Sequence, residues 1–460
     1  MAGLAIEFKK LLNKNSLSSL LTALGYSTVI SSGSWLVVIA FTFIFSYIAA
    51  KITGNYKKMI IYRTYVTYSI ALSLIISSPF QLLFSRFIAD QLFKKQLARI
   101  FPNYVGVISL TIIISTLFAI PISIFLFKGL PLIYKLIFVF TISILGAIWV
   151  STSLLAGLKK YIYIFFTFFF SYVFLGALLI YLYKYEIFYE FFAFYIVQVL
   201  LLVLFIIRII IAFPSTELIS FDFLKKENVY YSLAFTGLFY NLGIWVDKFL
   251  YWFNKETSHA IFSNIRNSFV YDFPVTLAFL TIVPGLAVLF LKVESDFAEY
   301  YSKFQVAILG KGQLDQIYFI INKIIYLIRI TIFSILFLQT ILDSILIIYE
   351  NKIFKALNVS LLYIPIFNVL MVGSALLLLF IAIFIFLSYL DRRQDLLLIT
   401  FTFFITNLLL TVFFMNLGIV FSGYGYTISL LIASLLGLFY LKRSLNEILY
   451  WVYIGNNQLN

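Results

Sequence analysis

Twelve long apolar runs dominate this sequence and limit what it can fold into. A helix needs about 20 mostly apolar residues to cross a membrane, and the runs approach or exceed that length. They occupy most of the 460 residues, of which 63% are hydrophobic and 11% charged, against roughly 45–50% apolar residues in soluble domains. We therefore predict an all-α polytopic membrane protein with transmembrane helices at 23–50, 59–90, 103–127, 133–157, 161–183, 189–213, 230–253, 269–291, 324–348, 360–390, 396–420 and 424–441.

The runs fall into two sets of six, which predicts two six-helix lobes. Residues 1–22 mix apolar and basic positions at helical spacing, a pattern typical of an amphipathic helix on the membrane surface. The N-terminal lobe is expected at 23–213 and the C-terminal lobe at 230–441. The inter-lobe connection 214–229 and a C-terminal tail at 442–460 complete the expected organisation.

A short charge pattern recurs six runs apart. In the second run a proline is followed by Arg86 and Asp90, and in the eighth a proline is followed by Lys292 and Asp296. Four residues are about one turn of an α-helix, so each spacing predicts an ion pair. The recurrence favours two lobes of the same orientation, related by a parallel pseudo-repeat as in several flippase-like transporter folds. Chance recurrence of so short a pattern is the alternative.

Basic residues predict the orientation of the chain. Lysine and arginine are more numerous in the termini and the even-numbered connections than in the odd-numbered ones, so the positive-inside rule places both termini in the cytoplasm. The net charge of +14 is spread over these short connections. This distribution suits anionic lipid headgroups and argues against a nucleic-acid partner.

Several classes of chemistry are excluded by the residues present. The chain has no cysteine, which rules out disulfides and cysteine-based catalysis or metal binding. Its one histidine, His259, falls in an expected loop, and one histidine cannot build a multi-histidine metal site. No nucleotide-binding, metalloprotease or serine-hydrolase motif is present. We expect neither an enzyme nor a protein that carries a cofactor or metal.

The stretch from Tyr240 to Lys248 interrupts the seventh apolar run with polar and charged residues. Asp247 lies about 25 Å along this run at 1.5 Å per residue, which places Asp247 and Lys248 in the outer third of the membrane. Because neighbours on a helix differ by about 100°, we expect these two side chains not to face each other. In the transport hypothesis, both side chains line the wall of a water-filled path. The structural alternative is that Lys248 reaches the interface while Asp247 neutralises it or Arg266.

Other candidates for the substrate path lie in the first, second, seventh and eighth runs. Charged candidates fall near run ends, and the middles supply hydroxyls, an amide and indole rings. Such a lining suits a neutral, hydroxyl-rich solute, since sugars stack on rings, although the same residue types also serve as ordinary helix-packing contacts. The full set is Ser31, Ser32, Trp35, Arg86, Asp90, Asn241, Trp245, Asp247, Lys248 and Asp272.

Several motifs together resemble the PelG family of exopolysaccharide transporters, within the multidrug/oligosaccharidyl-lipid/polysaccharide exporter superfamily. The resemblance runs over most of the chain. It departs from the family pattern at Ser34, where proline is expected, and at Ala5, where glycine is expected. The motifs that carry it are Met1–Leu12, Ile30–Trp35, Arg86–Asp90, Asn241–Lys248, Tyr271–Pro274, Ile282–Ala287, Val293–Phe297 and Leu390–Arg393.

The resemblance implies a carrier in the bacterial cytoplasmic (inner) membrane. Its expected cargo is a neutral polymer rich in N-acetylated hexosamine, exported for the biofilm matrix. The expected partners are a cytoplasmic glycosyltransferase like PelF, a membrane-anchored cyclic-di-GMP receptor like PelD, and a PelE-like membrane protein.

Our hypothesis from the sequence is therefore polysaccharide export through a lumen lined by runs one, two, seven and eight. Arg86 and Asp90 would guard the inner mouth, and Asp247, Lys248 and Asp272 the outer mouth. A flippase for a lipid-linked oligosaccharide is the first alternative, and would favour several deep basic residues. A cation-coupled drug antiporter would favour a lone acidic residue at the midplane. The fourth hypothesis is that the protein is a scaffold that holds a synthase at the membrane.

Overall fold

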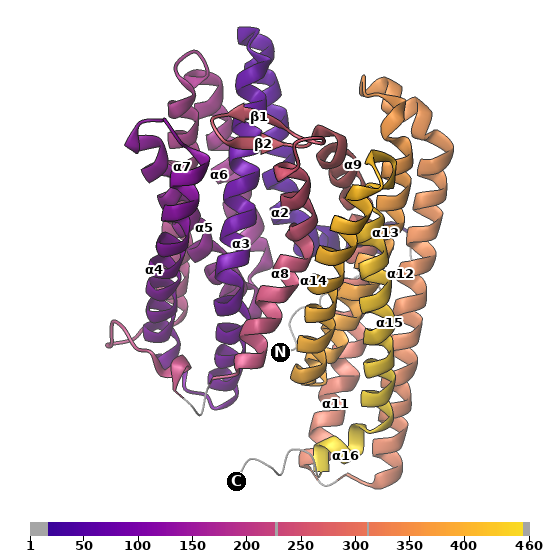
Figure 1. The fold of residues 1–460 in the computed structure, drawn as a ribbon. Coiled ribbons are helices and arrows are strands. Elements are labelled where there is room, and N and C mark those ends of the chain that lie inside the picture. Colours follow the sequence, from indigo (N-terminus) through magenta and orange to yellow (C-terminus); the bar gives the residue numbers. More distant parts are fainter. Residues whose placement is uncertain (1–16, 226–228, 311, 454–460) are drawn as a thin grey trace. The chain divides into compact units, whose positions relative to one another are not determined.

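The computed structural model describes residues 17–225, 229–310 and 312–453, and helices make up nearly all of this chain (Figure 1). Eleven of the described helices are long and apolar enough to cross a membrane. The helix of the seventh run, α8 (Tyr231–Phe253), is not among the eleven, because its threonine, asparagine, aspartate and lysine residues lower its mean hydropathy. The chain is a multi-pass membrane protein, as the apolar runs predicted.

Each of the twelve predicted runs is helical in the structure. The eighth run is divided in two at Thr281 and Ile282, and Pro284 lies in the first turn of its second helix, where a missing N–H group is harmless. The other helices of the runs are α2 (Leu17–Thr53), α3 (Tyr56–Phe93), α4 (Ile100–Leu126), α5 (Leu132–Gly157), α6 (Tyr161–Leu182), α7 (Ile187–Ala212), α9 (Phe269–Leu280), α10 (Val283–Lys292), α12 (Leu314–Ala356), α13 (Ile364–Tyr389), α14 (Arg393–Asn416) and α15 (Tyr424–Asn446).

The chain divides into two compact units. The first unit is Gly33–Phe269, and the second unit joins the described residues before Gly33 to those from Val270 onward. The six-helix lobes expected from the sequence have other bounds, since α8 groups with the first unit and the start of α2 with the second. The lobes and their repeat therefore stay predictions. The predicted surface helix at 1–22 falls mostly on residues outside the described chain, and from Leu17 the chain already belongs to α2.

The core of the first unit is built around α5, which contacts α3, α4, α6 and α7. Tyr65 on α3 stacks on Phe191 of α7 with ring centroids 3.8 Å apart, and its hydroxyl lies 3.0 Å from that of Thr141 on α5. Tyrosine suits such a position because its ring packs as an apolar group while its hydroxyl still finds a partner. The core of this unit is therefore aromatic, with its hydroxyl groups paired along neighbouring helices.

A short hairpin covers one end of the first unit (Figure 1). The sequence predicts a loop around His259, but β1 (His259–Phe262) pairs antiparallel with β2 (Ile265–Asn267). Asn264 in the turn donates from its backbone N–H to the carbonyl of Leu126, the last residue of α4, at 3.1 Å. The hydroxyl of Tyr68 on α3 donates to the carbonyl of Arg266 at 2.8 Å. These contacts join the hairpin to the end of α4 and to α3.

The connection between α7 and α8 is fastened to the start of α4 in its described part. The backbone N–H of Ser220 donates to the carbonyl of Pro102 at 3.0 Å, and that of Phe223 donates to the side-chain oxygen of Asn103 at 3.2 Å. The carboxylate of Asp222 accepts from Asn103 and Ser220 and pairs with Lys225. The ring of Phe223 is fully buried. This segment is thus a packed part of the first unit.

In the second unit the eighth run continues beyond α10 as a π-helix, η3 (Val293–Phe297), and then as α11 (Ala298–Leu309). The charged stretch after the eighth run is therefore helical as far as Leu309. The predicted ion pair between Lys292 and Asp296 is wrong, because these two described residues form no salt bridge. A π-helix bonds residues five apart, so a spacing of four no longer brings two side chains together.

Candidate transport path in the first unit

The polar helix α8 packs closely against α3 within the first unit. Gly237 is what allows the approach, since a Cβ atom at this position would lie 2.5 Å from the carbonyl oxygen of Ser78 on α3. Within α3, Ser78 is followed directly by Pro79. Small residues at helix contacts serve this purpose in membrane proteins, where apolar burial between helices supplies little driving force. The contact therefore holds α8 against α3 where Gly237 meets Ser78.

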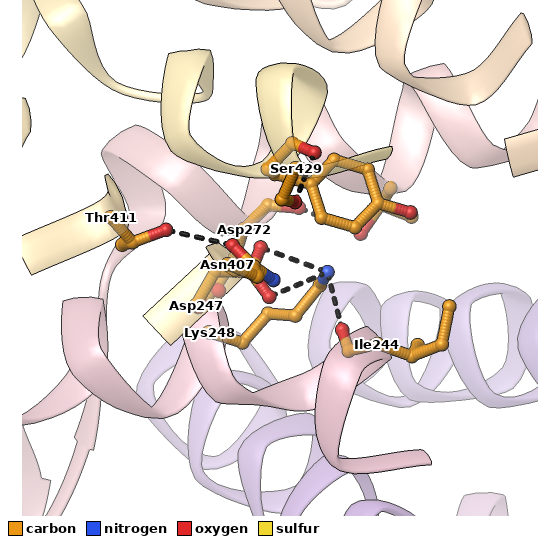
Figure 2. Close-up of polar contacts among 9 residues, drawn as sticks. Ile244, Asp247, Lys248, Asp272, Asn407, Thr411 and Ser429 are labelled. Carbon is orange, nitrogen blue, oxygen red and sulfur yellow. Dashed lines mark hydrogen bonds and ion pairs between the residues drawn. The ribbon is translucent and has the colours of Figure 1, made fainter. Parts of the chain in front are cut away.

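Asp247 and Lys248 form a buried ion pair on α8. The Lys248 ammonium donates to both carboxylate oxygens of Asp247, at 3.2 and 3.0 Å, and to the carbonyl of Ile244 at 2.7 Å (Figure 2). The side chains are 4% and 0% exposed. Our expectation that the two do not face each other is therefore wrong, because the long lysine chain bends back along the helix. Arg266 does not take part in this pair, since it donates to Ser258.

A second ion pair lies toward the other end of the same two helices. Arg86 Nε is 3.3 Å from a carboxylate oxygen of Asp90 one turn later on α3, which confirms the pairing predicted from their spacing. Tyr230, just before α8, joins both residues. Its ring lies under the Arg86 guanidinium at 5.5 Å, and its hydroxyl donates to Asp90 at 3.4 Å. This second pair is about a quarter to a third exposed, so it is more open than the first.

The remaining candidates are placed as follows. Ser32 is buried, and its hydroxyl lies 3.2 Å from that of Ser31. Asn241 donates to the carbonyl of Gly237, one turn earlier on α8, at 3.3 Å. Trp245 packs near Trp252, with ring centroids 6.3 Å apart. The two other candidates, Trp35 and Asp272, are both partly buried.

The structure unites these candidates only in part. It joins Asp247 to Lys248 and Arg86 to Asp90, all four on α3 and α8 of the first unit. Asp272 belongs to the second unit, where it lies in the first turn of α9. That unit has its own polar pair, in which Thr411 donates to the side-chain oxygen of Asn407 at 2.8 Å (Figure 2).

Sequence reasoning missed Glu190. This carboxyl lies in the first turn of α7 and is fully buried. In the sequence, Glu190 is an acidic residue at the start of the sixth apolar run. Such a position is typical of an ordinary charge at the membrane interface, so nothing marked it as buried. No group of three or more histidine, aspartate or glutamate residues within the described chain could hold a metal ion.

Three comparisons place the chain among known proteins. A family model described as "PelG: Putative exopolysaccharide Exporter (EPS-E)" matches residues 1–453. No curated protein sequence matches the chain. Among solved structures, an outward-facing multidrug resistance MATE family transporter of the MOP superfamily is similar at a TM-score of 0.67 and 12% identity, covering 93% of this chain and 96% of that one.

Two further solved structures share the fold. One is a MATE in the straight conformation, with a TM-score of 0.64 and 11% identity over 92% of this chain and 96% of that one. The other is a MOP superfamily transporter from Pyrococcus furiosus, with a TM-score of 0.56 and 12% identity over 93% and 96%. At such low identity the likeness concerns the fold alone. The match of the family model to nearly the whole sequence shows more, and on that basis the chain belongs to the PelG family of exopolysaccharide exporters, with the fold of MOP superfamily transporters.

Proposed function

We propose that this membrane transporter exports a neutral exopolysaccharide rich in N-acetylated hexosamine, by transport without covalent chemistry. The observation that best supports this proposal is the family match over residues 1–453. In this proposal the polymer passes along polar side chains of α3 and α8, including Arg86, Asp90, Asn241, Asp247 and Lys248. The candidates Ser31, Ser32, Trp35, Trp245 and Asp272 would contribute hydroxyls, rings and a further carboxylate.

The charges of α3 and α8 support a neutral cargo. Asp247 and Lys248 compensate each other at 3.0 Å, and so do Arg86 and Asp90 at 3.3 Å. Each pair has no net charge, whereas an anionic cargo such as a pyrophosphate-linked sugar would favour unpaired basic groups. Nearby ring and amide groups, such as Trp245 and Asn241, can serve the apolar faces and hydroxyls of a sugar.

The location and partners belong to the same proposal. We place the protein in the bacterial inner membrane with both termini in the cytoplasm, as the distribution of basic residues favours. A PelF-like glycosyltransferase would make the polymer on the cytoplasmic side. PelD-like and PelE-like membrane proteins would hold that enzyme beside the transporter. Export of the polymer would supply the biofilm matrix.

A secretion assay in the native host tests this function. Replacing the chromosomal gene by an Asp247→Asn or Arg86→Gln variant should reduce surface polysaccharide at least several-fold while polymer accumulates inside the cell. Glu217→Gln, an exposed position in the α7–α8 connection, is the matched control and should secrete normally. Membrane levels of each variant are measured in parallel.

The same assay separates the alternatives. Full secretion by both charge variants would remove these residues from the path. Deletion of the gene with no loss of surface polymer would overturn the proposed function. Reconstituted protein that moves only lipid-linked oligosaccharide would establish a flippase, and efflux of a cationic drug driven by an ion gradient would establish an antiporter.

A further inference from the structure

The first unit contains a carboxyl group that no hydrogen-bond donor compensates. Glu190, in the first turn of α7, is 0% exposed, and within the described chain neither of its carboxyl oxygens accepts a hydrogen bond. Leaving a charge buried without a partner costs several kcal/mol. An unsatisfied group of this kind in a native fold requires an explanation, of which a bound ion is one. In a membrane helix it marks a candidate functional site.

Two basic side chains of this region donate their hydrogen bonds to other groups. The ammonium of Lys58, at the start of α3, is within electrostatic range of Glu190, but it donates to the backbone carbonyls of Tyr183, at 3.0 Å, and of Tyr185. Arg63 donates to the Ser46 hydroxyl at 2.8 Å and to a carbonyl of α2. Neither cation forms a salt bridge with Glu190. The fold therefore keeps positive charge nearby without neutralising the carboxyl.

A second polar group without a partner lies in the same buried region. Tyr62 on α3 is 0% exposed, and its hydroxyl has no hydrogen-bond partner within the described chain. It interacts electrostatically with Glu190. Its ring packs edge-on against Phe194, one turn after Glu190 on α7, with centroids 6.4 Å apart. Two helices thus place a carboxyl and a phenol oxygen in one buried region, where the other charged or titratable groups are Lys58, Arg63, Tyr65, Tyr172 and Tyr183.

A surface cavity lies near this region. Its volume is about 550 Å³, and it lies at the end of the first unit where α2 connects to α3 and α6 connects to α7. Two of its lining residues belong to the neighbourhood of Glu190, since Lys58 interacts with that carboxyl and Tyr189 precedes it in sequence. Lys184, Tyr185 and Glu186 line the rest. The cavity therefore lies at the α6–α7 connection, and one of its lining residues is the sequence neighbour of Glu190.

We propose that Glu190 and Tyr62 bind a small monovalent cation, a proton or a sodium ion, that enters through this cavity. One carboxylate balances one positive charge. A bound proton would turn the carboxyl into a neutral acid, and a sodium ion would take oxygen ligands from both side chains. The site lies on α3 and α7 and shares no residue with the proposed sugar path. It would provide an ion that can be coupled to transport.

Ligand-dependent stability of the purified full-length protein in lipid nanodiscs tests this site. A cation that binds the folded state and not the unfolded state raises the unfolding midpoint once its concentration exceeds its dissociation constant. One arm titrates sodium chloride against choline chloride at pH 8 and constant ionic strength. The other arm lowers the pH from 8 to 6 in choline chloride. A response in the first arm identifies sodium, and a response in the second identifies a proton.

Three variants make the result specific. Glu190→Gln should abolish the response of the wild-type protein, and Tyr62→Phe should shift the half-maximal sodium or proton concentration about tenfold or more. Glu217→Gln removes an exposed carboxyl of the α7–α8 connection, outside this cavity, and should leave the response unchanged. A wild-type protein that responds in neither arm, or a Glu190→Gln protein that responds fully, overturns the proposal.

Two further features keep the test decisive. If Glu190→Gln does not give folded protein, the Tyr62→Phe titration decides, since an unchanged midpoint concentration there contradicts the site. Because no sugar transport is measured, failure of this ion site leaves the proposed export function standing. Failure of the secretion assay equally leaves the ion site to be judged by these titrations.

Discussion

Lys248 folds back onto Asp247, its neighbour in sequence, and donates to both of its carboxylate oxygens at 3.2 and 3.0 Å. Both side chains are almost completely buried. Removing one partner of a buried ion pair is strongly destabilising, by roughly 3–5 kcal/mol. We expect Asp247→Asn and Lys248→Met each to lower the free energy of unfolding by about that amount, measured by denaturation of the purified protein.

The double variant gives the control for this pair. Asp247→Asn combined with Lys248→Met removes both charges, so the total loss should be clearly smaller than the sum of the two single losses. Strict additivity of the two changes would show that the ion pair contributes nothing of its own to the stability of α8.

The close contact of α8 with α3 predicts an effect at Gly237. A Cβ atom there would meet the Ser78 carbonyl oxygen at 2.5 Å, and a backbone oxygen cannot rotate away. Gly237→Ala should therefore force the helices apart and destabilise the protein by about 1–3 kcal/mol. Thermal unfolding in detergent measures the change.

Gly157→Ala is the matched control for that substitution. Gly157 ends α5, and a Cβ atom at this position would meet no atom within 4 Å. Alanine is the better helix former by up to about 1 kcal/mol, so this variant should be neutral or slightly more stable. Equal destabilisation by both alanine variants would contradict a specific contact at Gly237.

Asp222 predicts how the α7–α8 connection responds to pH. The hydrogen bond from Lys225 holds the pKa of Asp222 below its ordinary value, and Asn103 and Ser220 lower it further against the opposing effect of partial burial. A carboxylate whose pKa is depressed in the folded state stabilises that state above the unfolded pKa, and this contribution is lost as the pH falls through the folded pKa. The connection should therefore loosen only in acid.

Hydrogen exchange at neutral pH checks this role of Asp222. The Asp222→Asn variant should exchange the backbone amides of Ser220 and Phe223 several-fold faster than the wild-type protein, because Asn103 loses its charged partner. Glu217→Gln, in the same connection but exposed, should exchange at the wild-type rate. Unchanged protection in Asp222→Asn would mean that the backbone contacts alone hold the segment.

The absence of cysteine allows a direct test of orientation. Single cysteines placed at Glu217 and at Glu256 lie in exposed parts of two different connections. With both termini in the cytoplasm, Glu256→Cys should react with a membrane-impermeant maleimide added to intact cells. Glu217→Cys should react only after the membrane is opened. The reverse labelling pattern would invert the proposed topology.

Much of the site could be predicted from spacing alone, but its geometry could not. The Arg86–Asp90 pair follows from a four-residue step on an α-helix, and the structure confirms it. The same step fails at Lys292 and Asp296, because the chain there forms a π-helix that hydropathy does not reveal. The hairpin around His259 escaped prediction because its strands are short, and contacts with Tyr68 and the end of α4 help to hold it.

The sequence by itself determined that this chain is a bundle of membrane-spanning helices, because backbone groups in lipid must be paired within each span and the spans must be apolar. It also determined the family, through motifs spread over most of its length. Only the tertiary structure decided which charges are compensated. Lys248 reaches Asp247 because a long side chain can turn back along its own helix. Glu190 lies unpaired because α3 and α7 pack around it while the carbonyls of neighbouring segments hold the nearby cations.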